Sequence, residues 1–166
     1  MLNGPWVAVI KQILIVCVGN VCRSPMAEHL FRRHLSPVGI QVESAGLGAL
    51  AGRAMDATAL QLLAERGVDG TAHRARQLSV SMIRSADLIL AMEREHMTQV
   101  MRLVPESRGK LMLLDCWESA LDIPDPFRQS REAFEHVAVL IDRGVRRWLK
   151  HVPPLRSPEP ARDYVH

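Results

Sequence analysis

A thiol and a guanidinium lie six positions apart near the start of the chain, at Cys17 and Arg23. A loop that turns from a strand into a helix can direct several backbone N–H groups at one point, and the helix N-terminus adds partial positive charge. We expect the Cys17 thiol to ionise near neutral pH in such a loop. The planar guanidinium of Arg23 can hold two phosphate oxygens at once. The pair therefore indicates attack of sulfur on a phosphate ester, through a phosphocysteine intermediate.

The residues between and after this pair complete an expected phosphate-binding loop. Gly19 allows the chain to bend with positive φ, and the Ser24 hydroxyl can donate to the sulfur. The alternative is structural, because buried thiols and first-turn arginines are common in folded domains. We favour the loop, since a strand precedes it and helix-start signals follow it. Its predicted members are Val18, Gly19, Asn20, Val21, Cys22 and Ser24.

Alternating strands and helices are predicted around this loop. Residues 12–18 are a short apolar run ending at Gly19, which is typical of a strand buried on both faces. Ser24 and Pro25 favour a helix start, and Pro37 and Gly39 end the helical pattern. Further strands are predicted at residues 40–44, 87–92 and 111–114, and further helices at residues 57–66, 80–84, 96–103 and 130–151.

This alternation predicts a doubly wound α/β fold, with a four-stranded parallel sheet and helices on both faces. Ligands of such folds bind at the carboxyl ends of the strands, where the loop after residue 17 lies. Segment 46–52 is rich in glycine and segment 123–127 has two prolines, so both are predicted to be loops. We predict one catalytic domain at residues 12–151, an N-terminal extension at 1–11 and a disordered tail at 152–166.

The composition is that of an ordinary soluble domain. Apolar residues make up 48% and charged residues 23% of the chain, and the net charge of +3 is spread along it. That charge does not indicate nucleic-acid binding, and it suits an anionic substrate. Neither a long uncharged apolar run nor a secretory leader is evident, so we expect a cytoplasmic protein that does not span a membrane. The three cysteines lack the spacing of a zinc site or a disulfide framework, and Cys116 is expected to be inert.

The Cys17 loop and a later segment, Asp125-Pro126-Phe127, together resemble the low-molecular-weight protein tyrosine phosphatases. The resemblance covers about residues 12–150 and rests on Cys-x5-Arg-Ser near the N-terminus and Asp-Pro-aromatic before the last helix. It implies an enzyme without metal or cofactor. Asp125 would be the general acid that protonates the departing tyrosine oxygen and later activates water. The residues alone leave two alternatives open, a plain turn at Asp125 and the nearby Asp122 as the acid.

The resemblance also implies residues that support the loop. Asn20 would be held by Glu28 and His73, and Ser44 would support the loop from the second strand. Cys22 would form a reversible disulfide with the nucleophile under oxidation. A small side chain packed in the loop is the equal alternative for Cys22.

Segments 46–50 and 125–132 look like those of bacterial members associated with capsule and exopolysaccharide synthesis. This implies a phosphotyrosine protein as partner, a membrane tyrosine autokinase with a phosphorylated tail. Leu47, Leu50 and Phe127 would form the substrate rim. Arg53 and Arg74 are candidates for contact with an acidic tail, or they are solvated surface.

Two rival functions remain open at this point. An arsenate reductase uses a similar fold and anion loop, but it needs further cysteines, and none lies at residues 80–95. Asp125 would also have no task in such an enzyme. A non-catalytic phosphotyrosine-binding module is the second rival, and intact Cys17, Arg23 and Asp125 argue against it.

Overall fold

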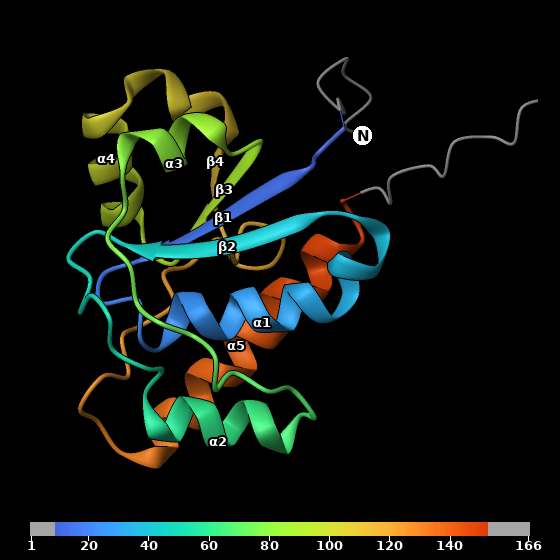
Figure 1. The fold of residues 1–166 in the computed structure, drawn as a ribbon, viewed down its shortest axis with the longest axis vertical. Helices are drawn as coiled ribbons and strands as arrows, with labels where there is room; N and C mark the ends of the chain where they lie inside the picture. The colour runs from blue at the N-terminus through green and yellow to red at the C-terminus, as the bar shows by residue number, and fades with distance from the viewer. Residues whose placement is uncertain (1–8, 153–166) are drawn as a thin grey trace, which may run out of the picture.

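The computed structural model describes residues 9–152, which form one parallel sheet covered by helices (Figure 1). The strand order is β2-β1-β3-β4, and each neighbouring pair is parallel. The predicted four-stranded doubly wound α/β fold is confirmed. The strands are β1 (Gln12–Cys17), β2 (Gln41–Gly46), β3 (Leu88–Ala91) and β4 (Leu111–Leu113).

Helices cover both faces of the sheet. Figure 1 shows α1 and α5 on one side, with α2 stacked beyond them, and α3 and α4 on the other side. Within residues 9–152, no helix is long and apolar enough to cross a membrane. The α-helices are α1 (Arg23–Leu35), α2 (Ala57–Glu65), α3 (Val80–Ser85), α4 (Arg94–Leu103) and α5 (Arg131–Leu149). Two short 3-10 segments are η1 (Ser36–Val38) and η2 (Pro105–Lys110).

The sheet has a hydrophobic core on each face, and strand β1 contributes side chains to both. Its alternate side chains point to opposite faces of the sheet. Ile13, Ile15 and Cys17 belong to the core shared with α1, α2 and α5, whereas Leu14 and Val16 belong to the core shared with α3 and α4. All five are buried, as expected for a strand covered on both faces. Cys17 therefore leaves the sheet on the side of α1.

The start of α4 differs from the prediction for a reason that lies far away in the sequence, whereas the start of α5 is fixed locally. Helix α4 begins at Arg94, two residues before the predicted start, because the Arg94 backbone N–H donates to Asp122 Oδ1 at 2.9 Å. Helix α5 begins after Ser130, whose hydroxyl accepts from the backbone N–H of Ala133 at 3.3 Å. The two 3-10 segments were not predicted. Helix α4 thus gets its N-terminal cap from a distant loop.

The end of β2 runs beside the Cys17 loop. β2 continues to Gly46, two residues past the predicted end, and Gly46 pairs with Cys17. A Cβ atom on Gly46 would lie 2.3 Å from the backbone oxygen of Val18, so this approach requires glycine. Beyond β2, the N–H groups of Leu47 and Gly48 donate to the carbonyls of Cys17 and Val18 at 2.9 and 3.0 Å. Segment 46–50 therefore forms a side wall of the loop.

The predicted extension and tail fall mostly outside the described residues. At the C-terminal end, Val152 is buried against the core, and its N–H donates to the carbonyl of Trp148 at 2.9 Å. The proposed boundaries at residues 12 and 151 stay predictions.

Candidate active site

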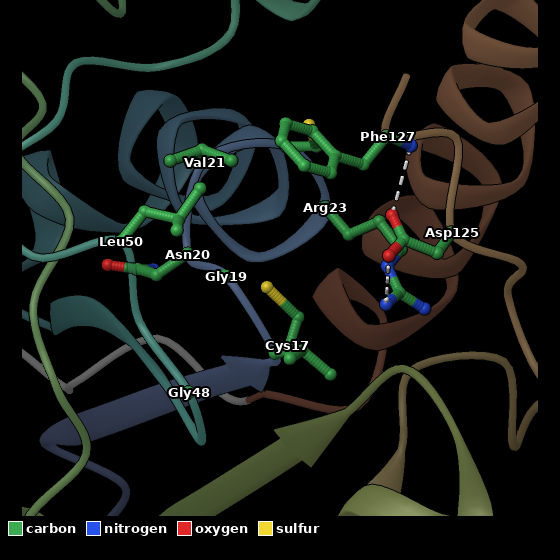
Figure 2. Close-up of a pocket in the computed structure, with 11 residues that line it drawn as sticks. Cys17, Gly19, Asn20, Val21, Arg23, Gly48, Leu50, Asp125 and Phe127 are labelled. Carbon is green, nitrogen blue, oxygen red and sulfur yellow. Dashed lines mark hydrogen bonds and ion pairs between the residues drawn. The ribbon is translucent and has the colours of Figure 1, made fainter. Parts of the chain in front are cut away.

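A cavity of about 150 Å³ opens at the carboxyl end of β1 (Figure 2). Cys17 ends β1 and Arg23 begins α1, so the loop between them bends around the cavity. The loops at 46–52 and 123–127 supply its other walls. The lining residues are Cys17, Val18, Gly19, Asn20, Val21, Cys22, Arg23, Gly48, Leu50, Asp125 and Phe127.

The sulfur of Cys17 has a hydrogen-bond partner in Ser24. Cys17 Sγ lies 2.8 Å from Ser24 Oγ, and either atom can be the donor. Asn20 Nδ2 also lies 2.8 Å from Ser24 Oγ, and an amide nitrogen can only donate. The Ser24 oxygen accepts from Asn20, and its own proton is free for a bond to the sulfur.

The guanidinium of Arg23 is buried beside the cavity and fixed at one end. Its Nη1 contacts the Glu93 carboxylate and donates to the carbonyl of Ile123 at 2.8 Å. Its Nη2 lies 3.6 Å from Asp125 Oδ2. Two partners therefore orient the guanidinium, and its remaining N–H groups can bind oxygens of an anion in the cavity.

Asp125 reaches the cavity from the loop before α5. Its Oδ1 accepts from the backbone N–H of Phe127 at 3.1 Å, and about half of its side chain is exposed. Asp122, the alternative left open by the sequence, does not line the cavity. Its carboxylate instead caps α4, as described above. Of these two aspartates, Asp125 is the one whose carboxylate lines the cavity, where a general acid would have to lie.

Four hydrogen bonds of Asn20 hold the loop in shape, and its backbone adopts an uncommon conformation. It is fully buried, and its φ is +58°, in the left-handed region. Its Nδ2 donates to Ser24 and to Ser44 Oγ at 2.9 Å, and its Oδ1 accepts from the backbone N–H of Arg76 at 2.9 Å. Its carbonyl accepts from His73 Nε2 at 2.7 Å. The loop is therefore tied to β2 and to segment 73–76.

Comparison with known proteins identifies the family. The family described as low molecular weight phosphotyrosine protein phosphatase has a sequence model that matches residues 12–155. The chain belongs to this family. The low molecular weight protein-tyrosine-phosphatase Wzb of Escherichia coli (strain K12) is 47% identical to the phosphatase over 138 residues, which are 83% of this chain and 92% of Wzb. The predicted family, and its bacterial branch that includes Wzb, are confirmed.

Solved structures agree with this assignment. Wzb of Vibrio vulnificus, in complex with benzylphosphonate, superposes with a TM-score of 0.81 at 43% identity, covering 86% of the phosphatase and 99% of that chain. The YwlE arginine phosphatase of Geobacillus stearothermophilus superposes with a TM-score of 0.78 at 32% identity, covering 86% and 92%. The phosphatase thus shares its fold with Wzb and with a protein named as an arginine phosphatase.

The other predicted support residues lie behind the loop. Ser44 Oγ donates to Glu28 Oε2 at 2.5 Å, so Glu28 reaches Asn20 through Ser44 rather than directly. His73 Nδ1 lies 3.6 Å from the same carboxylate. Burial lowers the pKa of His73, although the hydrogen bond to the Asn20 carbonyl acts in the opposite direction. Because a carbonyl only accepts, His73 Nε2 carries the proton in this contact.

The rim is partly as predicted. Figure 2 shows Leu50 and Phe127 flanking the space above the Cys17 sulfur. Leu47 does not line the cavity, because it packs against the core on the α3–α4 side of the sheet. Gly48 lines the cavity in its place. Of the two candidate arginines, Arg53 is exposed, and Arg74 donates to the carbonyls of residues 71 and 73 at 3.1 and 2.6 Å.

Burial disfavours the thiolate form of the two remaining cysteines. It raises the pKa of Cys22 far above its usual range, and the nearby Asp56 and Cys17 add to this effect. Burial also raises the pKa of Cys116 to about 11. Within residues 9–152 all three cysteines are free thiols. Their environments therefore make Cys22 and Cys116 poor nucleophiles near neutral pH.

Sequence reasoning missed Glu93 and His96. Glu93 follows β3 and so lies at the same sheet edge as Cys17, a position that a search for polar residues after each strand would have found. His96 Nε2 lies 3.6 Å from Glu93 Oε1, and its Nδ1 has no partner among residues 9–152. Burial lowers the pKa of His96, and the positive charge of Arg23 lowers it further. A buried histidine, whose environment disfavours its charged form, and the Glu93 side chain therefore lie behind the arginine.

Proposed function

We propose that the phosphatase hydrolyses phosphotyrosine in proteins through a phosphocysteine intermediate. One observation carries the proposal. The Cys17 sulfur lies 2.8 Å from the Ser24 hydroxyl oxygen and shares a single cavity with Arg23 and Asp125. A nucleophile, an anion clamp and a proton donor thus meet around a space that fits a phosphate group.

In the first step, the Cys17 thiolate attacks phosphorus, forming the S–P bond as the P–O bond to tyrosine breaks. Arg23 follows the equatorial oxygens as the phosphoryl group becomes planar, and backbone N–H groups of the loop stabilise their charge. Protonated Asp125 gives its proton to the departing phenolate oxygen. In the second step, the Asp125 carboxylate takes a proton from water, the water oxygen attacks phosphorus, and the S–P bond breaks to release inorganic phosphate.

The walls of the cavity favour an aryl substrate. Val21, Leu50 and Phe127 present apolar surface around the opening, and Asp125 is the single carboxylate among the lining residues. A neutral phenol ring gains from apolar contact, whereas the guanidinium of phosphoarginine would need further anionic partners. The relative that binds benzylphosphonate, a benzyl ring carrying a phosphonate, supports this choice. Phosphoarginine, the substrate named for YwlE, is the second candidate because of that likeness.

The physiological substrate we propose is a bacterial membrane tyrosine autokinase that controls exopolysaccharide or capsule synthesis. Support comes from the similarity to Wzb and from segments 46–50 and 125–132 of the sequence.

We also propose that Cys22 protects the nucleophile, by forming a disulfide with Cys17 after oxidation. Cys22 lies on the same loop and lines the same cavity.

A direct comparison of substrates tests the function. Purified phosphatase is assayed for phosphate release from a phosphotyrosine peptide and from a phosphoarginine protein, and for arsenate-dependent thiol oxidation. We expect rapid turnover of phosphotyrosine, slow turnover of phosphoarginine and no arsenate reduction, with all turnover lost in Cys17→Ser. Faster release from phosphoarginine would replace the proposed substrate. Binding of phosphotyrosine without turnover would leave a binding module.

Trapping tests the physiological partner. Asp125→Ala protein should retain bound phosphotyrosine substrate, because the tyrosine oxygen leaves slowly without a proton donor. Mass spectrometry of proteins captured from lysate of the source bacterium is expected to identify a tyrosine autokinase. Wild-type protein, which releases its substrates, is the control. Capture of other phosphotyrosine proteins without a kinase would refute the autokinase assignment and leave the catalytic function intact.

A further inference from the structure

Arg128 lies in a fixed turn between the acid loop and α5. Its φ is +61°, in the left-handed region that arginine rarely adopts. The turn is closed by two hydrogen bonds of Gln129, from its N–H to the carbonyl of Pro126 at 2.9 Å and from its Nε2 to the carbonyl of Asp125 at 2.8 Å. The direction in which the Arg128 side chain leaves the backbone is therefore set relative to the cavity.

The guanidinium of Arg128 rests on a wall of the cavity. Its central carbon lies 5.2 Å from the ring centroid of Phe127, which lines the cavity. This distance is that of a cation–π contact, in which the ring takes up one side of the guanidinium and leaves N–H groups free to donate elsewhere. Arg128 is exposed, and no carboxylate among residues 9–152 pairs with it. Its donors are thus presented to solvent beside the place where a substrate enters.

The positive charge of Arg128 also lies at a position that is electrostatically unfavourable for a cation. It precedes the N-terminus of α5, where the helix dipole disfavours a cation. The neighbouring Arg131 is neutralised by Glu65 and Glu135, at 2.7 and 2.8 Å. Arg128 has no such partner in the described part of the chain. Strained backbone and unpaired charge both cost stability, so they persist mainly where function requires them. Arg128 combines the two beside the cavity.

We infer that Arg128 binds a negatively charged group next to the phosphotyrosine of the substrate, either an acidic side chain or the phosphate of a second phosphotyrosine. This inference rests on the proposed tyrosine phosphatase function. A substrate ring lying against Phe127 brings the flanking residues of its peptide close to Arg128. Carboxylate and phosphate both present two oxygens that match the two edge N–H groups of a guanidinium.

Three peptides of equal length test the inference, with the residue next to phosphotyrosine being alanine, glutamate or a second phosphotyrosine. For wild-type protein we expect kcat/KM to be about three- to fivefold higher with glutamate than with alanine. With the second phosphate, which carries nearly two charges, we expect about tenfold. In Arg128→Ala both ratios should fall to about one. The matched control is Arg108→Ala, an exposed arginine of η2 at the opposite edge of the sheet, which should keep the wild-type ratios.

A glycine variant separates recognition from folding. Arg128→Gly removes the guanidinium but adopts positive φ without strain, so its urea midpoint should rise while its preference for charged peptides disappears. Loss confined to the glutamate peptide identifies an acidic side chain as the ligand, and loss confined to the doubly phosphorylated peptide identifies clustered phosphotyrosines. Unchanged ratios in Arg128→Ala, or equal losses in Arg108→Ala, overturn the inference. If no phosphotyrosine peptide is hydrolysed at all, the proposed function fails instead.

Discussion

Replacement of Asn20 by alanine should separate the folding of the active-site loop from its chemistry. The variant loses the three hydrogen bonds of the Asn20 side chain, to Ser24, to Ser44 and from the N–H of Arg76. At about 1 kcal/mol for each bond, this costs about 3 kcal/mol of unfolding free energy. Asn20 and alanine both carry a Cβ, so at φ +58° the backbone adds little to this cost. We expect a total loss of about 3 kcal/mol.

Urea denaturation followed by fluorescence of Trp117 and Trp148 measures this loss. The control is Asn20→Gly, which loses the same three hydrogen bonds but adopts positive φ without strain. It should be about 1 kcal/mol more stable than the alanine variant. Below the unfolding transition, kcat/KM should fall about 10- to 100-fold in both variants, because the Ser24 proton is no longer directed at the sulfur. A loss of unfolding free energy under about 1 kcal/mol would refute the claim that the three Asn20 hydrogen bonds stabilise the folded loop.

Four further predictions concern separate parts of the site. Asp125→Asn should slow hydrolysis far more for aryl phosphates with poor leaving groups than for those with good ones, and equal slowing would remove Asp125 from the acid role. Glu93→Ala should lower kcat/KM about tenfold by freeing the guanidinium that Glu93 orients, with circular dichroism to check that the fold is kept. Burial holds the pKa of His73 below 6.5, so the unfolded chain binds the proton first as pH falls. Unfolding free energy should therefore drop as pH falls below about 6.5, and His73→Gln should flatten that drop; a variant as pH-dependent as wild type would contradict this. Finally, peroxide should inactivate Cys22→Ser irreversibly, whereas dithiothreitol should restore the wild type through the Cys17–Cys22 disulfide, and full recovery of the variant would exclude Cys22 from protection.

The sequence predicted the parts of the site that are local. Cys17 and Arg23 sit at the two ends of one strand-to-helix loop, so their types and spacing are enough to bring them together. The fold followed from the succession of strands separated by helices along the chain. Asp125 lies far along the chain from Cys17, and the resemblance to a known family identified it where spacing could not.

Contacts between distant segments were not predictable in the same way. Glu93 meets Arg23 because β1 and β3 are neighbours in the sheet, a pairing that no local pattern encodes. Leu47 was expected at the rim, yet the pairing of β2 through Gly46 turns its side chain toward the other core. Asp122 competed with Asp125 on sequence grounds, and the fold separates the two, because Asp122 caps α4 and does not line the cavity.

The loop that carries the acid is fastened two residues before Asp125. The Ile123 N–H donates to the carbonyl of Met92 at 2.9 Å, its carbonyl accepts from Arg23, and its side chain is buried. A wide swing of this loop would have to break those contacts and release Arg23 at the same time. The proposed proton donor, Asp125, is therefore built into the resting enzyme, rather than delivered by a closing lid as in many enzymes. Turnover should accordingly be insensitive to added viscogens such as sucrose, since no large segment must travel through solvent before the ester is cleaved.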